Sequence, residues 1–151
     1  MSQLVAYLSF DGNCREAFEF YQHCLGGNYE FQKVGESPMA KDVPASLHDQ
    51  VLHGSLTNAS IKLMGADSLG MGGSLNRGNA VALCLVCSSK EDIERFFSRL
   101  SEDGQVTNPL REEFFGTYAD LTDRYGIRWM LQYDGANMGA AAPANGAVSS
   151  T

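Results

Sequence analysis

Four cysteines are the first side chains in this sequence that could bind a metal ion. Cys84 and Cys87 have the C-x-x-C spacing of a zinc site, but they lie inside "VALCLVCS", whose β-branched and aliphatic residues predict a strand. Residues three apart on a strand point to opposite faces, so this pair cannot hold one ion without a kink. Cys14 and Cys24 have only His23 as a neighbouring ligand. We therefore interpret all four cysteines as reduced thiols that serve as small hydrophobic side chains.

Histidine is the next candidate for chemistry, because its pKa lies near neutrality. His53 stands in "VLHGSL", where the leucines are expected to face a helix and to leave His53 and Ser55 on the other side. It could act as a general base or bind an acidic ligand. A single histidine without an evident carboxylate partner can equally be a hydrogen-bonded part of the scaffold. His48, in a loop, and His23, on a helix, are expected to be solvated.

Glu112 and Glu113 precede "FFG" in a segment that we expect to be a loop. One of them could pair with a base, Arg128 or Lys62, or with His53, and buried carboxylates with such partners are frequent functional groups. Adjacent glutamates in an acidic protein can also simply face water. Glu113 is the stronger catalytic candidate of the two because it adjoins the phenylalanines.

Composition limits the classes of partner. The chain has 151 residues, 44% of them hydrophobic, with a net charge of -7 and a pI near 4.8, so its field should repel nucleic acid and anionic lipid. It has no run of eighteen apolar residues, and "MSQLVAYLSF" lacks the basic region of a signal peptide. We therefore expect a cytoplasmic protein that binds neither nucleic acid nor membrane. "GADSLGMGG" lacks the Lys-Ser/Thr ending of a phosphate-binding loop.

An internal repeat must position these side chains. "VAYLSF" from residue 5 and "VALCLV" from residue 81 each predict a strand, followed by an amphipathic helix with a paired aromatic, Phe20-Tyr21 or Phe96-Phe97. Asn13 and Ser89 are predicted helix N-caps, and Gly26 and Gly104 are predicted helix ends.

Three strand signals follow each helix, so each half reads β-α-β-β-β. The expected strands cover residues 28–36, 49–57 and 59–67 in the first half and 105–113, 114–123 and 127–134 in the second. Module 1 then spans about 4–67, a Gly- and Ser-rich connector 68–78, and module 2 about 79–134, within one domain of residues 1–134. Residues 135–151 carry no charge and almost no large side chain, which predicts a flexible tail.

The ordered set "AYLSF", "DGNCREAFEFYQHCLGG", "LHGSL" and "EEFFG" with the closing "TDRYGIRWM" resembles the PhnB-like branch of the vicinal oxygen chelate superfamily, which includes glyoxalase I, bleomycin resistance proteins and dioxygenases. The resemblance covers residues 4–134. It implies an α+β fold of paired βαβββ modules, whose curled mixed sheets surround a cavity, usually in a homodimer. An older label of this branch is a demethylubiquinone methyltransferase, but the glycine-rich nucleotide turn that could hold a methyl donor is absent.

In metal-using relatives, four His or Glu ligands come from the first and last strands of the two modules. The resemblance maps these places to Val5, Met64, Val81 and Met130. Valine has no donor atom, and a methionine thioether is a soft ligand that does not suit hard divalent ions. A two-residue error in register would substitute Tyr7, Lys62, Leu83 and Arg128, or Ser9, Ala66, Leu85 and Gln132; neither set makes a His/Glu site. We therefore predict no metal and no cofactor.

The two methionines stand in a repeated pattern, "IKLM" and "IRWM". Strand alternation places Leu63 and Trp129 behind the sheets, in the core, and Met64 and Met130 in front. Methionine suits the lining of an adaptable pocket, although it could instead pack a dimer seam. The predicted cavity residues are Val5, Tyr7, His53, Lys62, Met64, Val81, Leu83, Phe115, Arg128 and Met130.

The sequence thus predicts a PhnB-like protein that binds a small organic molecule, with no assigned reaction. Two alternatives stay open. One is a metal-free acid–base enzyme that uses His53 and a glutamate, and the other is a structural dimer whose cavity is filled by side chains.

Overall fold

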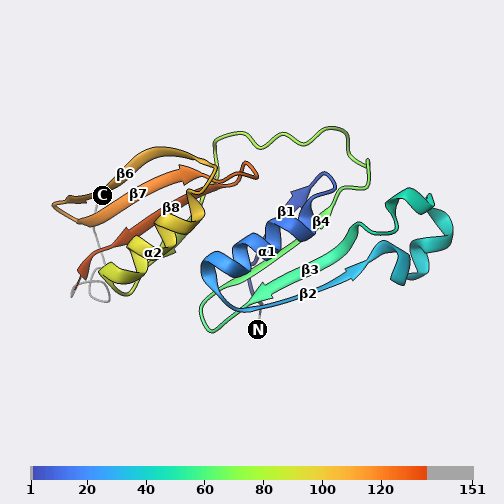
Figure 1. The fold of residues 1–151 in the computed structure, drawn as a ribbon, viewed down its shortest axis with the longest axis horizontal. Helices are drawn as coiled ribbons and strands as arrows, with labels where there is room; N and C mark the ends of the chain where they lie inside the picture. Colours follow the sequence, from blue (N-terminus) through green and yellow to red (C-terminus); the bar gives the residue numbers. More distant parts are fainter. Residues whose placement is uncertain (1, 136–151) are drawn as a thin grey trace. The chain divides into compact units, whose positions relative to one another are not determined.

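The computed structural model describes residues 2–135, and the predicted tail lies outside them except for its first residue. The described residues form two compact units that divide between Asn76 and Arg77, and this boundary falls within the connector predicted for residues 68–78. Each unit contains one helix and one four-stranded mixed sheet (Figure 1). The predicted α+β fold of two βαβββ modules is confirmed.

The first unit has the strand order β1-β4-β3-β2, with β1 parallel to β4 and the other neighbours antiparallel. Three 3-10 turns, Val34–Glu36, Pro38–Asp42 and Ala45–Leu47, join β2 to β3. Its regular elements are β1 (Ala6–Phe10), α1 (Cys14–Leu25), β2 (Asn28–Lys33), β3 (Val51–Thr57) and β4 (Lys62–Asp67).

The second unit repeats this topology in the order β5-β8-β7-β6, with β5 parallel to β8. Both parallel pairs bring the first and last strands of a module side by side, as a βαβββ unit requires. The elements are β5 (Leu83–Val86), α2 (Lys90–Leu100), β6 (Gln105–Glu113), β7 (Gly116–Thr122) and β8 (Arg128–Tyr133).

Each helix covers one face of its own sheet, and the core of each unit lies between the helix and that face. In the first unit, alternate residues of the strands, such as Phe10 and Leu63, are buried together with Phe18 of α1. Gly65 permits this close approach, because a Cβ there would lie 2.8 Å from Cε1 of Phe18. Leu4 precedes β1 and is fully exposed, so it takes no part in this core.

In the second unit, Ile93 and Leu100 of α2 are buried, as are Leu121 of β7 and Leu131 of β8. Trp129 is 2% exposed, so its predicted place in the core is confirmed. Its Nε1 donates a 2.8 Å hydrogen bond to Oδ2 of Asp123 in the β7–β8 turn. Backbone amides of Tyr125 and Ile127 donate to Oδ1 of the same carboxylate, at 2.8 and 3.1 Å, and so stabilise the turn between β7 and β8.

The start of α1 is held by a residue from β4 rather than by its own N-cap. Asn13 makes no side-chain capping bond. The buried carboxylate of Asp67 instead accepts hydrogen bonds from the backbone amides of Gly12 and Cys14 through Oδ1, at 2.9 and 3.0 Å, and from Val51 through Oδ2, at 2.8 Å. One carboxylate therefore ties the start of the helix to the start of β3.

The other predicted helix ends differ in outcome. Ser89 caps α2 as predicted, because its hydroxyl accepts a 3.0 Å bond from the Asp92 amide, and Gly26 ends α1 with φ of 77°. Gly104 is not a helix cap, since α2 ends at Leu100 with Ser101 as its C-cap. Glycine is required there by close packing, because a Cβ would lie 2.5 Å from the Thr122 carbonyl oxygen.

Candidate functional site

Each sheet has one face covered by its helix and a second face, which we call the open face. On the open face of the first unit, Met64 is half-buried between Leu63 and Gly65, which are buried on the helix side. A row of directly paired residues crosses the four strands at this level. This row consists of Tyr7, Met64, Ser55 and Glu30.

His53 lies on the same open face as the row. Its Nδ1 is 3.3 Å from the hydroxyl oxygen of Tyr7, and the two ring centroids are 5.9 Å apart. His53 alternates with the buried Gly54, and Ser55 alternates with the buried Leu56. The sequence thus placed His53 and Ser55 on the correct side of β3, and the structure adds Tyr7 as the partner of the imidazole.

On the open face of the second unit, Met130 is flanked along β8 by Trp129 and Leu131, which are buried on the helix side. The row at this level contains Asn108, Asp120, Met130 and Cys84. Sequence reasoning did not select Asp120, although the alternation of "YADLT" already separates it from the apolar Ala119 and Leu121.

Leu83 was predicted on the open face, and this prediction is wrong. The parallel pairing sets Leu83 opposite the buried Trp129 and sets Cys84 opposite Met130, so Cys84 occupies the place that Tyr7 has in the first unit. The alignment of "VAYLSF" from residue 5 with "VALCLV" from residue 81 suggested a register one residue away. A shift of one residue turns every side chain of a strand to the other face.

The remaining predicted cavity residues lie at the ends of strands. Val5 is half-buried just before β1, while Val81 lies before β5 and is 78% exposed. Lys62 and Phe115 are exposed, the latter in the β6–β7 turn. Arg128 shares the open face with Met130, and its Nη1 donates a 2.6 Å hydrogen bond to the Asn79 carbonyl.

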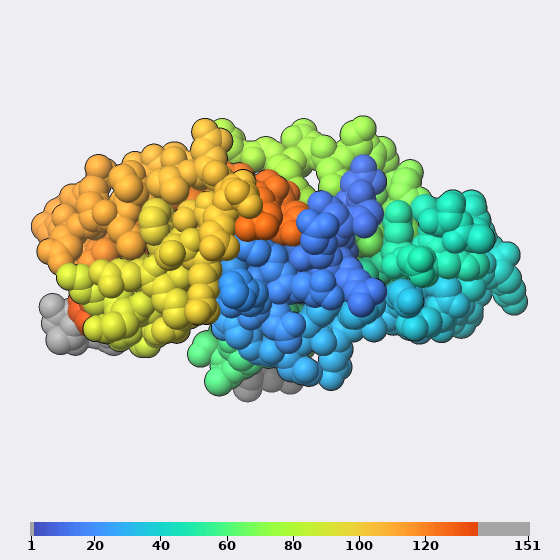
Figure 2. All heavy atoms as spheres, in the orientation of Figure 1, coloured from blue at the N-terminus to red at the C-terminus, as the bar shows by residue number. Residues whose placement is uncertain are grey.

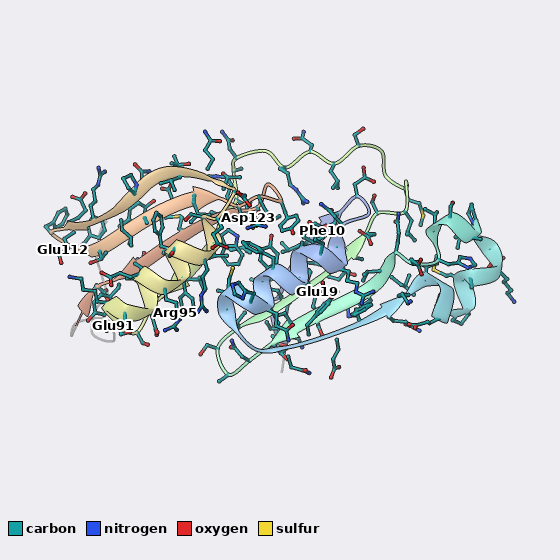
Figure 3. All side chains as sticks on the ribbon, in the orientation of Figure 1. Phe10, Glu19, Glu91, Arg95, Glu112 and Asp123 are labelled. Atoms are coloured by element: carbon teal, nitrogen blue, oxygen red, sulfur yellow. The ribbon has the colours of Figure 1, made fainter. Side chains whose placement is uncertain are left out.

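The two glutamates lie at the end of β6, which agrees with the strand expected over residues 105–113 and not with the expected loop before "FFG". Figure 3 shows Glu112 at the end of this strand, where its carboxylate lies 3.6 Å from Nζ of Lys90. Glu113 forms a 2.7 Å ion pair with Nε of Arg111. The sequence left open a pairing of one glutamate with Arg128, Lys62 or His53. In the structure, the ion pairs of the two carboxylates are with bases along β6 and at the start of α2. Much of β6 is exposed at the surface (Figure 2).

His48 is not simply solvated as predicted. It is half-buried, and its Nε2 lies 2.9 Å from the carbonyl oxygen of Ala40 and 3.2 Å from that of Val43. It thus connects the turns between β2 and β3. His23 is exposed on α1, as expected.

The open faces carry few groups suited to a hard divalent ion. Met64 and Met130 offer thioethers, which are soft and weak ligands. Burial raises the pKa of the Tyr7 hydroxyl and of the Cys84 thiol opposite them, which disfavours the anionic forms that bind metals. Among residues 2–135, no group of three or more His, Cys, Asp or Glu side chains could hold a metal ion. The residues at the positions implied by the superfamily therefore do not fit such an ion.

The paired modules define the glyoxalase/bleomycin resistance/dioxygenase fold, which solved proteins of that description share. The chain belongs to the PhnB-like family whose model is described as 3-demethylubiquinone-9 3-methyltransferase, and residues 2–132 match it. No helix within the described part of the chain has the length and apolar character needed to cross a membrane.

Three relatives illustrate this membership. The crystal structure of protein PA1353 from Pseudomonas aeruginosa is 35% identical, covers 89% of this chain and 98% of its own, and has a TM-score of 0.79. Protein YjdN of Escherichia coli is 28% identical over 85% of this chain and 92% of its own. A PhnB protein from Bacillus cereus, described as a putative 3-demethylubiquinone-9 3-methyltransferase, shares the fold at 24% identity, with coverage of 87% and 99% and a TM-score of 0.70.

Proposed function

We propose that this protein binds a small organic molecule on the open faces of its sheets, without a divalent metal ion. The observation that supports this most directly is the equivalent placement of Met64 and Met130. Each lies on the last strand of its module, half-buried, beside a residue of the parallel first strand. An unbranched thioether in the middle of such a face adapts to ligands of different shape.

Polar groups beside each methionine would orient a molecule bound on that unit's own open face. The first unit has the Tyr7–His53 pair beside Met64, and the second, taken by itself, has Tyr118, Asn108 and Asp120 beside Met130. A few convergent polar groups among apolar side chains are typical of small-molecule sites. The methyltransferase description of the family is not part of this proposal, because neither strand-to-helix turn, "DGN" or "CSS", has the glycine-rich sequence that binds nucleotide cofactors.

Thermal unfolding of the full chain across a library of small organic compounds tests the proposal. A compound that binds only the folded state stabilises the protein by mass action and so raises the midpoint temperature of unfolding. The stabilisation is about 2.7 kcal/mol when the free concentration of the compound is one hundred times its Kd. The variant Met130→Glu should weaken this stabilisation. Met71→Glu is the matched control, because Met71 is exposed in the connector. A library without any stabilising compound would contradict binding.

Metal analysis of the same preparation tests the second half of the proposal. We expect less than one bound divalent ion per chain and no change of thermal midpoint after chelation. One tightly held ion per chain, whose removal lowers the midpoint, would contradict it.

The contact between Tyr7 and His53 favours one further possibility, acid–base catalysis on the bound molecule. A histidine within hydrogen-bond reach of a phenol can exchange protons with a reacting group. Turnover of a library ligand that is lost in His53→Ala, while binding and folding persist, would support catalysis. Equal turnover in this variant would exclude a role for His53.

A further inference from the structure

Asp120 in the second unit is a buried carboxylate. One of its oxygens accepts hydrogen bonds, and the other has no hydrogen-bond partner among the described residues. The residue is 6% exposed. Its Oδ2 accepts a 2.6 Å hydrogen bond from the Tyr118 hydroxyl and a 2.9 Å bond from Nδ2 of Asn108. Its Oδ1 is buried, and no hydrogen-bond donor among the described residues reaches it. Buried carboxylate oxygens are normally satisfied, so this arrangement requires an explanation.

The strand register places Asp120 on the open face. Its flanking residues Ala119 and Leu121 are buried on the helix side, opposite Leu131 and Trp129. Asp120 itself lies directly opposite Met130 of β8. Directly opposed residues of antiparallel strands share a face, so the carboxylate is a close neighbour of the methionine that we propose to contact the ligand.

The two donors fix the direction of the carboxylate before any ligand binds. Burial, the hydrogen bond to Asp120 and the charge of that residue raise the pKa of Tyr118 to about 12, so its hydroxyl keeps the proton that it donates. Asn108 adds a second donor from β6, across the sheet. A side chain oriented in this way loses little entropy on binding.

The base on the same face forms no ion pair with this carboxylate. Arg128 lies two residues before Met130 and its charge acts on the Tyr118 hydroxyl, but its Nη1 donates to the carbonyl of Asn79, and the described residues include no ion pair of Asp120. The net charge of -7 also favours the approach of cations over anions. A positively charged nitrogen is therefore the group that best complements Oδ1.

We infer that Asp120 is the anchor for a ligand that carries a protonated nitrogen next to an apolar group. The nitrogen donates to Oδ1, and the apolar group contacts Met130. Because Oδ1 is buried, the Met130 side chain moves to admit the nitrogen, which its rotatable bonds allow. This inference rests on the proposed small-molecule function and names the chemistry of its ligand.

Titration of the full chain with benzylamine, benzyl alcohol and benzoate tests the inference, because the three probes differ mainly in charge. The readout is the chemical shift of the isotopically labelled methionine methyl groups. We expect benzylamine to move the signal of Met130, and to bind at least about tenfold more tightly than benzyl alcohol, the smallest effect expected of a charged hydrogen bond. Benzoate should not bind.

The variant Asp120→Asn removes the charge with little change in shape, and should weaken benzylamine binding at least about tenfold. Glu94→Gln is the matched control, since it removes one charge from an exposed position on α2 and should leave binding unchanged. Circular dichroism establishes that each variant is folded. If Asp120→Asn fails to fold, the comparison of the three probes on the unmodified protein still decides the question.

Three results would overturn the inference. The first is that benzyl alcohol or benzoate binds as tightly as benzylamine. The second is that benzylamine does not bind at millimolar concentration, and the third is that it binds equally to a folded Asp120→Asn. The proposed function survives these results if the compound library contains a neutral or anionic ligand. It fails separately if no compound of any charge stabilises the protein.

Discussion

Replacement of Asp67 by asparagine changes a carboxylate on which three backbone amides converge, and its effect can be worked out from their geometry. Oδ1 accepts from Gly12 and Cys14 at the start of α1, and Oδ2 accepts from Val51 at the start of β3. The asparagine carbonyl can keep the two bonds to the helix. Its amide group then faces the Val51 amide, so a donor meets a donor and one bond is lost.

The cost has two parts. Loss of a hydrogen bond to a charged group costs about 1.5–3 kcal/mol, and loss of a negative charge at a helix N-terminus about 0.3–1 kcal/mol. We therefore expect Asp67→Asn to lower the free energy of unfolding by about 2–4 kcal/mol. Asn13 makes no capping bond, so Asn13→Ala should cost less than about 0.5 kcal/mol, whereas a hydrogen-bonded N-cap would cost about 1 kcal/mol.

Urea unfolding followed by far-ultraviolet circular dichroism measures both variants. Trp129 is the only tryptophan of the chain and lies in the second unit, so its fluorescence shows whether that unit unfolds together with the first. An Asp67→Asn protein within about 0.5 kcal/mol of the original, or an Asn13→Ala protein that is the less stable of the two, would refute the assignment of Asp67 as the residue that holds α1.

Two further predictions concern the open face of the second unit. The pKa of Tyr118 is raised to about 12, so its contribution to stability is present below the unfolded value of about 10 and is lost as the pH rises toward 12. Asp120→Asn should lower this pKa, as measured by tyrosine absorbance relative to Tyr118→Phe; an unchanged titration would contradict the contact. Cys84 is the one exposed cysteine, so a thiol reagent should label one site in the folded protein, four after denaturation, and none in folded Cys84→Ser. Although Cys84 is exposed, partial desolvation of its sulfur by neighbouring side chains raises the pKa of this thiol, so labelling should accelerate with pH. Labelling of two or more sites in the folded protein would contradict the structure.

Local patterns in the sequence were sufficient to predict the order of the helices and strands. Alternating apolar residues identified most strands, and helical spacing identified α1 and α2, because both periods depend on which face of an element meets the core. The same alternation placed Trp129 in the core and Met64 and Met130 away from it. The gap between the strands expected over 49–57 and 59–67 also agrees, since Oδ1 of Asn58 accepts from the Ser60 and Ile61 amides in the turn between β3 and β4.

Only the tertiary structure decided which residues from distant strands meet. The pairing of β5 with β8 moved Leu83 to the helix side and brought Cys84 opposite Met130. Asp67 reaches a helix start that is more than fifty residues earlier in the chain, a contact for which no local pattern provides a signal. Asp120 and Asn108 come together because β6 has register shifts that change which residues face each other. Periodicity describes one element at a time, whereas register and bulges arise from hydrogen bonds between elements, so a one-residue difference that is invisible in the sequence decides which side chains form the site.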